Sequence, residues 1–496
     1  MIRPNLHCIL VALYTFIIAQ PLRSQGLTLS LDNAIGLAKG QSLDFKMAQY
    51  AYKSGFWNYS SFRASLFPAV SLVGTIPSYN RSIQRVTLPT GQDIFVPSNQ
   101  AYSTLSLSLT QQVGLTGGTL SVYSSLSRID LFGKSLSSHQ YSTVPVSISY
   151  SQGMVGYNPI KWQKKAVPLI FEESQRSYYE ARENICLSVV RLYFALLQAQ
   201  DQVRLDEQNA ISADTIVKVT KDRFYLGTRT KDDLLRAELD LLEQRKNISR
   251  DKVFLEQARQ NFVQYLHLPA GDSVVLHAPE DVVFFPVSLT LAMEKASANR
   301  QKVVEFRRRR LEAEQNLASA KAAAAPVISV FGNLGYSQTD KQFLRSYSDL
   351  LAQQTVSLQV SIPIIDWGMN RARVRKARAD LELAASSIEQ EQMAFEQEIS
   401  FQTMQWNMLE VQLSVAREAR TIAMERFDLA KQHYNANTIG FTEYSIAQQQ
   451  KDAAVNSYTD NLRNFWTGYY TLRRLTLFDF RTMTSLLKTD NDEFHP

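Results

Sequence analysis

The chain uses one sequence pattern twice, as FYLGTRTKDDLLRAE at Phe224–Glu238 and as YNANTIGFTEYSIAQ at Tyr434–Gln448. A second pair of related segments precedes each copy: FPAVSLVG at Phe67–Gly74 and APVISVFG at Ala325–Gly332. Both copies keep the same order, with a strand segment first and two long helical segments after it. A repeat of this size is a supersecondary unit used twice, not the short period of a solenoid.

Length and composition exclude several classes of protein. The 496 residues are enough for two or three ordinary domains. The net charge is only +6, and basic residues are spread among acids, unlike the concentrated basic surface of a nucleic-acid-binding protein. We interpret the one basic run, Arg307–Arg310, as a solvated helix face, with a phosphate site as the alternative. Metal-binding and nucleophile motifs are absent, so we expect no metal, no cofactor and no enzyme activity.

The N-terminus has the pattern of a secretory signal. Arg3 precedes the apolar run Cys8–Ala19, which is too short to span a bilayer, and cleavage is expected after Ala19 or Ser24. Cys186 is then the remaining cysteine, and its helical apolar context predicts a packing residue. Later segments lack about 18 consecutive apolar residues. An exported chain of this kind is either soluble outside the inner membrane or crosses a membrane as a β-barrel.

Periodicity divides the chain into alternating helical and strand blocks. We predict a signal peptide at 1–24, an N-terminal helix at 25–66, a first strand block at 67–157 with an extra hairpin at 101–130, a first long helix pair at 158–268, an equatorial segment and connecting helix at 269–325, a second strand block at 326–368, a second long helix pair at 369–478 and a flexible tail at 479–496. The first strand block is longer than the second by about 46 residues, because Pro68 to Gly156 is 88 positions and Pro326 to Gly368 is 42.

The predicted strands alternate apolar residues with Ser, Thr, Gln and Asn, and aromatic residues gather near their ends. These aromatic residues are Tyr79, Tyr102, Tyr141, Tyr150 and Trp367. One apolar face, one uncharged polar face and aromatic ends are typical of a barrel wall in lipid. A small soluble sheet packed on the helices is the alternative. Because one chain offers only four to six strands, and an open sheet edge is costly in lipid, several copies must share one barrel.

The longest helical segment has apolar residues at alternating steps of four and three. The series is Leu381, Ala385, Ile388, Phe395, Ile399, Trp406, Leu409, Leu413 and Ala416. A 3.5-residue period requires partner helices on a shared seam. Helices alone are equally consistent with a secreted or surface-attached coiled-coil structural or adhesion protein. That alternative does not explain why a strand block recurs in the middle of the chain.

Taken in order, these blocks resemble the outer-membrane efflux family, the TolC-like proteins, over nearly the whole mature sequence. The local motif is an aromatic residue near a glycine, followed by a polar residue, an acid, leucine and alanine. It is present as Tyr225, Gly227, Thr230, Asp233, Leu234, Leu235 and Ala237, and again as Tyr434, Thr438, Glu443 and Ala447. The second copy departs from the motif at Asn437, although Gly440 lies nearby. Pro363, Asp366, Trp367 and Gly368 resemble the turn of the family from its last strand to its long helix.

The resemblance implies an α+β membrane protein: a homotrimer with a twelve-stranded transmembrane β-barrel in the cell outer membrane, continued by a long periplasmic α-helical barrel. It implies an exit duct for small molecules or polypeptides that docks on a periplasmic adaptor protein and an inner-membrane pump, and that binds outer-membrane lipid but no nucleic acid. The extra hairpin departs from the family. We expect it to lengthen the extracellular rim; two further strands per subunit, and eighteen in all, is the alternative.

The resemblance also assigns roles to residues at the helix tips. Adaptor docking and gating are implied for Tyr225, Gly227, Arg229, Asp233, Tyr434, Thr438 and Gly440. Glu443 is implied to be the acid that constricts the pore, with an ordinary solvated helix-tip acid as the alternative. A second acid of the family is Ile446 here, and an arginine that ties the tip shut is Ile439. We therefore expect a different lock, with Arg229 and Asp233 as candidates.

Overall fold

The computed structural model describes residues 27–132, 137–269 and 274–487. The predicted signal peptide and the end of the predicted tail, 488–496, lie outside the described residues. The chain divides into two compact units that are built from discontinuous segments. The tip unit consists of Met1–Ala51, Arg176–Arg300 and Ala394–Pro496, and the sheet unit consists of Tyr52–Gln175 and Gln301–Met393.

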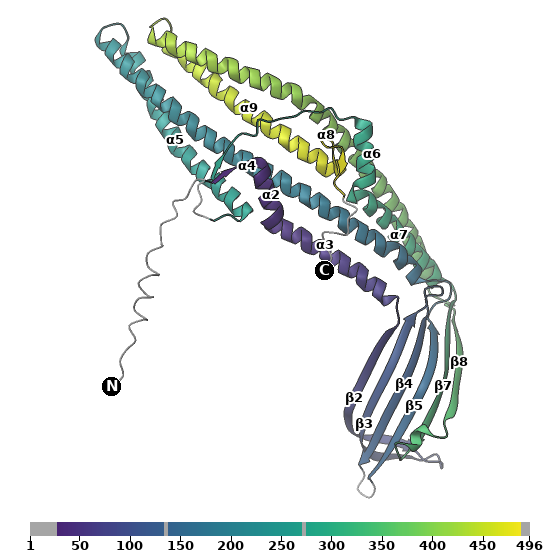
Figure 1. Cartoon of the computed structure of the whole chain (residues 1–496). Helices are drawn as coiled ribbons and strands as arrows, with labels where there is room; N and C mark the ends of the chain where they lie inside the picture. Colours follow the sequence, from purple (N-terminus) through teal and green to yellow (C-terminus); the bar gives the residue numbers. More distant parts are fainter. Residues whose placement is uncertain (1–26, 133–136, 270–273, 488–496) are drawn as a thin grey trace, which may run out of the picture. The chain divides into compact units, whose positions relative to one another are not determined.

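The centre of the sheet unit is one six-stranded antiparallel sheet (Figure 1). Its strands are β2 (Ala69–Thr87), β3 (Asp93–Gln112), β4 (Thr119–Phe132), β5 (Ser137–Gln152), β7 (Val327–Asp340) and β8 (Leu351–Ser361), and they lie in this order across the sheet. Strands from both copies of the repeat therefore belong to the same sheet, joined where β5 pairs with β7.

The expectation that the extra hairpin forms a rim outside the wall is wrong for this sheet. Strands β3 and β4 occupy its second and third positions. Strand β3 pairs with β2 from Asp93 to Thr110 and with β4 from Gln100 to Gln112. The reason is local: the alternation that makes one face of Leu105–Leu126 apolar is the same as in the neighbouring strands, so these residues can share their register.

The register gives the sheet one apolar face and one hydroxyl-rich face. The apolar face carries Val70, Leu72, Leu105, Leu107, Leu109, Leu120, Val122, Ile148, Ile328, Val330, Leu334, Val356, Leu358 and Val360. The opposite face carries Ser71, Ser106, Ser108, Ser121, Ser147, Ser149, Ser329, Ser357 and Gln359. In the single chain every residue of β8 is exposed on both faces. Lipid on one side and water on the other would satisfy this pattern.

Four helices adjoin the same end of the sheet: α3 (Leu43–Ser65), α4 (Pro159–Tyr225), α7 (Gln301–Ala324) and α8 (Met369–Asn435). Asn158 begins α4 by accepting a hydrogen bond from the Lys161 backbone N–H (3.1 Å). Asp366 begins α8 in a similar way, accepting hydrogen bonds from the backbone N–H groups of Gly368 and Asn370 (2.9 and 3.0 Å). Side-chain caps therefore mark the points at which α4 and α8 begin after the strands.

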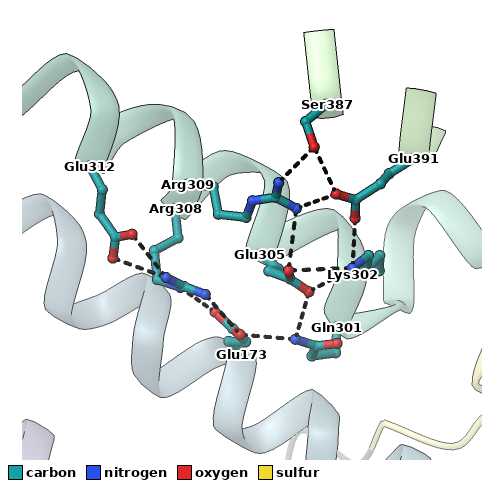
Figure 2. Close-up of polar contacts among 9 residues, drawn as sticks. All are labelled: Glu173, Gln301, Lys302, Glu305, Arg308, Arg309, Glu312, Ser387 and Glu391. Atoms are coloured by element: carbon teal, nitrogen blue, oxygen red, sulfur yellow. Dashed lines mark hydrogen bonds and ion pairs between the residues drawn. The ribbon is translucent and has the colours of Figure 1, made fainter. Parts of the chain in front are cut away.

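Within the sheet unit, α7 is connected to α4 and α8 by an ion-pair network (Figure 2). Arg308 contacts Glu173 of α4 at 2.6 Å, and Arg309 contacts Glu391 of α8 at 2.6 Å. Lys302 also reaches Glu391, at 2.8 Å. The interpretation of Arg307–Arg310 as a solvated helix face is therefore wrong for its two middle arginines, which face acids on neighbouring helices; the two outer arginines are exposed.

The tip unit contains most of α4, α5 (Lys231–Leu266), most of α8 and α9 (Phe441–Thr476), together with α2 (Leu31–Gln41) and α6 (Leu289–Asn299). Strand β1 (Leu27–Leu29) pairs in parallel with β6 (Val274–Leu276). The predicted seam of α8 is confirmed here, since Phe395, Ile399, Trp406, Leu409, Leu413 and Ala416 are all buried. Burial of each large apolar side chain stabilises the fold by about 1.5–3 kcal/mol.

Two predicted single helices are each two helices. The segment predicted at 25–66 consists of β1, α2 and α3, with a break at Ser42. Ser42 has an extended backbone, and its Oγ accepts a hydrogen bond from the Phe45 backbone N–H (3.2 Å), which caps α3. The connecting helix is likewise divided into α6 and α7 at the extended Arg300. At Ser42 the apolar period continues across the capping serine, so the periodicity alone predicts one helix where there are two.

The start of the predicted flexible tail is ordered. Strands β9 (Phe478–Asp479) and β10 (Thr484–Ser485) form a small antiparallel pair. Arg473 of α9 bridges Asp479 (3.2 Å) and the buried Glu183 of α4 (3.0 Å), so this end of the chain is attached to the helices by charge. Cys186 lies nearby in the core, where burial raises the pKa of its thiol to about 11. Among the described residues, every helix is too short or too polar to cross a membrane.

Candidate functional site: the paired helix tips

The two helix–turn–helix tips have the same backbone. The Thr228 N–H donates to the Arg223 carbonyl (2.9 Å), and the Thr438 N–H donates to the His433 carbonyl (3.0 Å). In each turn the preceding residue is left-handed: φ is +72° at Gly227 and +63° at Asn437. This is the Schellman ending of a helix, which glycine favours and asparagine tolerates.

The apparent departure at Asn437 is therefore a substitution within the same turn. Gly440 does not replace the missing glycine, because its φ of −82° is open to any residue. It is instead the N-cap of α9, at the position that Thr230 holds before α5. A Cβ at Gly440 would lie 2.7 Å from Oε2 of Glu443, so glycine leaves room for that carboxylate to fold back.

The two tips differ in how their second helices begin. Thr230 and Asp233 form a capping box: Thr230 Oγ1 accepts from the Asp233 N–H (3.1 Å), and Asp233 Oδ2 accepts from the Thr230 N–H (3.2 Å). Hydrogen bonding from Thr230 holds the pKa of Asp233 below its ordinary value. The N-cap Gly440 makes no side-chain cap bond. The predicted site residue Asp233 is thus engaged in its own turn.

A small hydrophobic cluster packs the tips together. It consists of Ile216, Ala237, Phe427, Tyr434, Tyr444 and Ala447. Repeat-related tyrosines have opposite environments: Tyr434 is 1% exposed, whereas Tyr225 is 75% exposed. The Tyr434 hydroxyl is within hydrogen-bond distance of Thr220 Oγ1 (2.8 Å), so its burial leaves no polar group unpaired. Of the two motif aromatics, only Tyr225 is available to a partner at this surface.

Two arginines of the first tip hold the backbone of the second. Arg223 donates to the Tyr434 carbonyl (3.0 Å) and to the Asn435 carbonyl, and Arg229 donates to the Ile439 carbonyl (3.0 Å). The Arg229 guanidinium also lies over the Tyr434 ring, 5.3 Å from its centroid. We name this pair of arginines the tip clamp.

Of the two candidates for the lock, Arg229 belongs to the tip clamp and Asp233 does not. The two residues form no ion pair in the described part of the chain. Sequence reasoning missed Arg223. Its signal was a basic residue in the last turn of a helix, where it is favoured beside free carbonyl groups. This position predicts that Arg223 lies near carbonyl groups of a helix end, but it does not predict that those carbonyls belong to the other tip.

Glu443 lies in the first turn of α9 and is exposed. Within the described residues it makes no ion pair. Ile439 packs against the tip cluster, and Ile446 is 43% exposed on the same helix as Glu443. An exposed carboxylate at a helix N-terminus is stabilised by the helix dipole, and it remains free to face a pore or solvent.

The predicted aromatic belt divides between the two ends of the sheet. Tyr150 and Trp367 lie at the helix end, and Trp367 is 95% exposed in the turn before α8. Tyr79 and Tyr141 lie toward the far end, on the apolar face. Tyr102 is the exception: it shares the face of the hydroxyl residues, and its hydroxyl is 3.1 Å from Ser127 Oγ. Its register makes Tyr102 a residue of the polar face, not of a lipid-facing belt.

Comparison with known proteins identifies the class to which this fold belongs. The family model described as "Outer membrane efflux protein" matches residues 34–266 and 292–476. The chain therefore belongs to the outer membrane efflux protein family. A comparison with curated protein sequences found no significant match.

Several solved structures share the fold. The outer-membrane channel OprN has 16% sequence identity and a TM-score of 0.65, over 90% of this chain and 89% of that one. The Campylobacter jejuni CmeC outer membrane channel has 15% identity and a TM-score of 0.64, over 90% and 85%. CusC, described as a transmembrane channel, has 14% identity and a TM-score of 0.61, over 93% and 95%.

Family and fold together define an outer-membrane efflux channel of a tripartite system, with a periplasmic extension. The family is one of channels, not of enzymes. The alternative of a coiled-coil adhesion protein is set aside, because the family match covers helices and strands alike.

Proposed function

We propose that three copies of this chain assemble into one exit duct, which carries cargo from a periplasmic adaptor and an inner-membrane pump to the exterior. The observation that carries the proposal is the sheet, which ends at two unpaired strands, β2 and β8, within the described residues. The strands alternate in direction, so β8 of one copy runs antiparallel to β2 of the next and can pair with it. Unpaired edges cost several kcal/mol per group in lipid, and closure removes that cost.

The helices of the tip unit support the same assembly. Helix α8 has a second apolar stripe outside its buried seam: Met404, Met408, Val411 and Val415 follow steps of four and three, and each is more than half exposed. Helix α5 has an equivalent exposed stripe at Leu235, Leu239 and Leu242. Apolar stripes with this heptad spacing are typical of helices that pack against another helix. A neighbouring copy presents the complementary surface, since each chain offers both stripes.

The tips are proposed as the gate and the adaptor-docking end. In this state the tip clamp ties the α8–α9 turn to the α4–α5 turn, so opening requires the two pairs of helices to separate. Three copies of Glu443 around an axis would form a ring of negative charge, which favours cations. Tyr225, Gly227 and Thr438 supply exposed positions for an adaptor at the turns.

A matched pair of variants tests the assembly. Val411→Glu places a carboxylate in the exposed stripe of α8, whereas Gln412→Glu places a carboxylate at the next exposed position, outside the stripe. We expect Val411→Glu to shift detergent-purified protein from trimer to monomer in native mass measurements, and Gln412→Glu to remain trimeric. A wild-type particle that has the mass of one chain and still conducts ions would overturn the proposal.

The same trimers, in planar bilayers, test the pore role of Glu443. Glu443→Ala is expected to raise cation conductance or to weaken cation selectivity. Conductance and selectivity equal to those of the wild type would remove Glu443 from the gate while leaving the duct intact.

A further inference from the structure

We propose that the barrel of this channel has eighteen strands, six from each of three chains, and that its exit is wide enough for bulky hydrophilic cargo of polypeptide width. The proposal rests on the trimeric duct proposed above. It follows from the hairpin β3–β4, which the second copy of the repeat lacks. Two observations within the sheet unit make this hairpin part of the wall.

The first observation is the continuous register. Strands β3 and β4 pair without irregularity from Gln100↔Leu131 to Gln112↔Thr119. Leu105, Leu107 and Leu109 continue the apolar face of β2 on one side and of β4 on the other. Residues of a water-exposed rim have no need of an apolar face that matches the lipid-facing strands.

The second observation is the anchoring of the inner turn, Val113–Gly118, at the helix end of the sheet. Asn158 donates from Nδ2 to the carbonyls of Gly114 (2.9 Å) and Leu115 (3.0 Å), while its Oδ1 caps helix α4. Tyr150 donates to Thr116 Oγ1 (2.7 Å). The hairpin is therefore built into the junction between strands and helices, whereas a rim lies at the opposite end of the strands.

Gln111 provides a further anchor at this junction, since its Nε2 donates to the Leu66 carbonyl (2.7 Å) beyond the end of α3. Space is also closed around the turn: a Cβ at Gly118 would lie 2.6 Å from the Tyr150 hydroxyl. Gly117 has a φ of +81°, which glycine adopts without strain. The turn therefore packs closely against Tyr150 of β5 and contains a position, Gly117, that favours glycine.

The width of such a barrel follows from strand geometry. Strands spaced about 4.8 Å apart and tilted about 40° occupy roughly 6.3 Å of perimeter each. Eighteen strands then need a perimeter of about 113 Å, and twelve strands need only about 75 Å.

The backbone diameter of an eighteen-stranded barrel is about 36 Å, against about 24 Å for twelve strands. The face opposite the apolar one carries mostly hydroxyl and amide groups, together with Val73, Tyr123 and Phe331. It has no charge between Ser71 and Thr75 of β2 or along β8. A wide lumen with this uncharged lining does not filter by charge, so it fits a bulky polar chain as well as small molecules.

Electron microscopy of the full-length trimer in lipid nanodiscs tests the strand number directly. We expect eighteen strands in cross-section, with β8 of one chain beside β2 of the next. A trimer whose barrel has twelve strands, with β3 and β4 outside the wall, would overturn the inference and leave the proposed duct standing. Failure to form any trimer would instead refute the duct itself.

Polymer exclusion in planar bilayers gives an independent measure of width. Poly(ethylene glycol) added only from the barrel side enters as far as the tips, so its size cut-off reports the barrel and not the gate. A variant lacking residues 88–136, which joins Thr87 to Ser137 and removes β3 and β4, should have a cut-off radius smaller by about one third. An unchanged cut-off in a folded trimeric variant would overturn the inference; if that variant does not fold, the wild-type strand count decides.

Discussion

At the scale of single residues, the tip clamp connects the tips of the two copies of the repeat. Arg223 and Arg229 are only partly buried, yet they donate to backbone carbonyls of the opposite tip. Carbonyl groups at a helix end lack intrahelical partners, and a guanidinium can satisfy more than one of them. The clamp therefore stabilises the state in which the tips touch.

Replacing Arg229 should favour the open state. Arg229→Ala removes one hydrogen bond and one cation–π contact, worth about 1–2 kcal/mol together, so the open population should rise on the order of 5–30-fold. Open probability in single-channel recordings measures the change. Arg236→Ala is the control, because Arg236 lies on the same tip and forms its ion pair with Asp232 of its own helix. Equal open probabilities for both variants would exclude Arg229 from the lock.

At the scale of elements, α7 acts as a connector between α4 and α8 in the sheet unit (Figure 2). Its basic residues alternate between Glu173 on one side and Glu391 on the other. Hydrogen bonds from Lys302 and then Arg309 lower the pKa of Glu391 to about 2. Since folding depresses this pKa, the ionised Glu391 stabilises the folded state above its ordinary pKa near 4.5, and that contribution is lost as the pH falls toward 2.

Glu391→Gln is therefore expected to change the acid sensitivity of the helices. The wild type should lose thermal stability between pH 4.5 and about 2, and the variant should start lower at pH 7 and lose less across the same range. Circular dichroism of the detergent-solubilised protein at each pH measures this. Glu389→Gln is the control, as Glu389 is exposed on the same helix. The ion-pair assignment fails if the two variants have superimposable pH profiles.

At the scale of the whole molecule, the proposed assembly covers surfaces that a single chain leaves exposed. Within the described residues, both edge strands of the sheet are unpaired, and two stripes of the helices are apolar and exposed. The sheet carries both environments side by side, because successive residues of a strand face opposite sides. Adjacent positions in β8 can therefore report separately on lipid and on the lumen.

Val356→Arg and Thr355→Arg form such a pair. Val356 lies on the apolar face in the middle of β8, so an arginine there should cost about 2–4 kcal/mol of folding free energy in lipid. Thr355 lies on the hydroxyl face, where an arginine should be tolerated and should lower cation conductance. Folding into vesicles under urea measures the first effect, and bilayer recordings measure the second. Equal stabilities of the two variants would contradict the orientation of the sheet.

Much of this architecture was predictable because its signals are local. The duplicated turn, the strand alternation and the 3.5-residue seam ending at Ala416 each depend on neighbours a few residues apart. The Schellman turns also follow from local chemistry, although Asn437 in place of glycine concealed the second one. Breaks at Ser42 and Arg300 were missed, because the apolar period continues across both positions although the backbone is extended there.

Consecutive residues are enough to predict which side chains lie on one face of a helix and which face of each strand is apolar, since period and alternation are local properties. Contacts between distant residues are visible only in the folded chain: β3 and β4 lie within the sheet, Arg223 binds the opposite tip, and Arg308 and Arg309 meet acids on two other helices. Alternation predicts the apolar face of a strand but not its neighbouring strand, and a charged residue has the same local sequence pattern whether its side chain meets water or a distant partner.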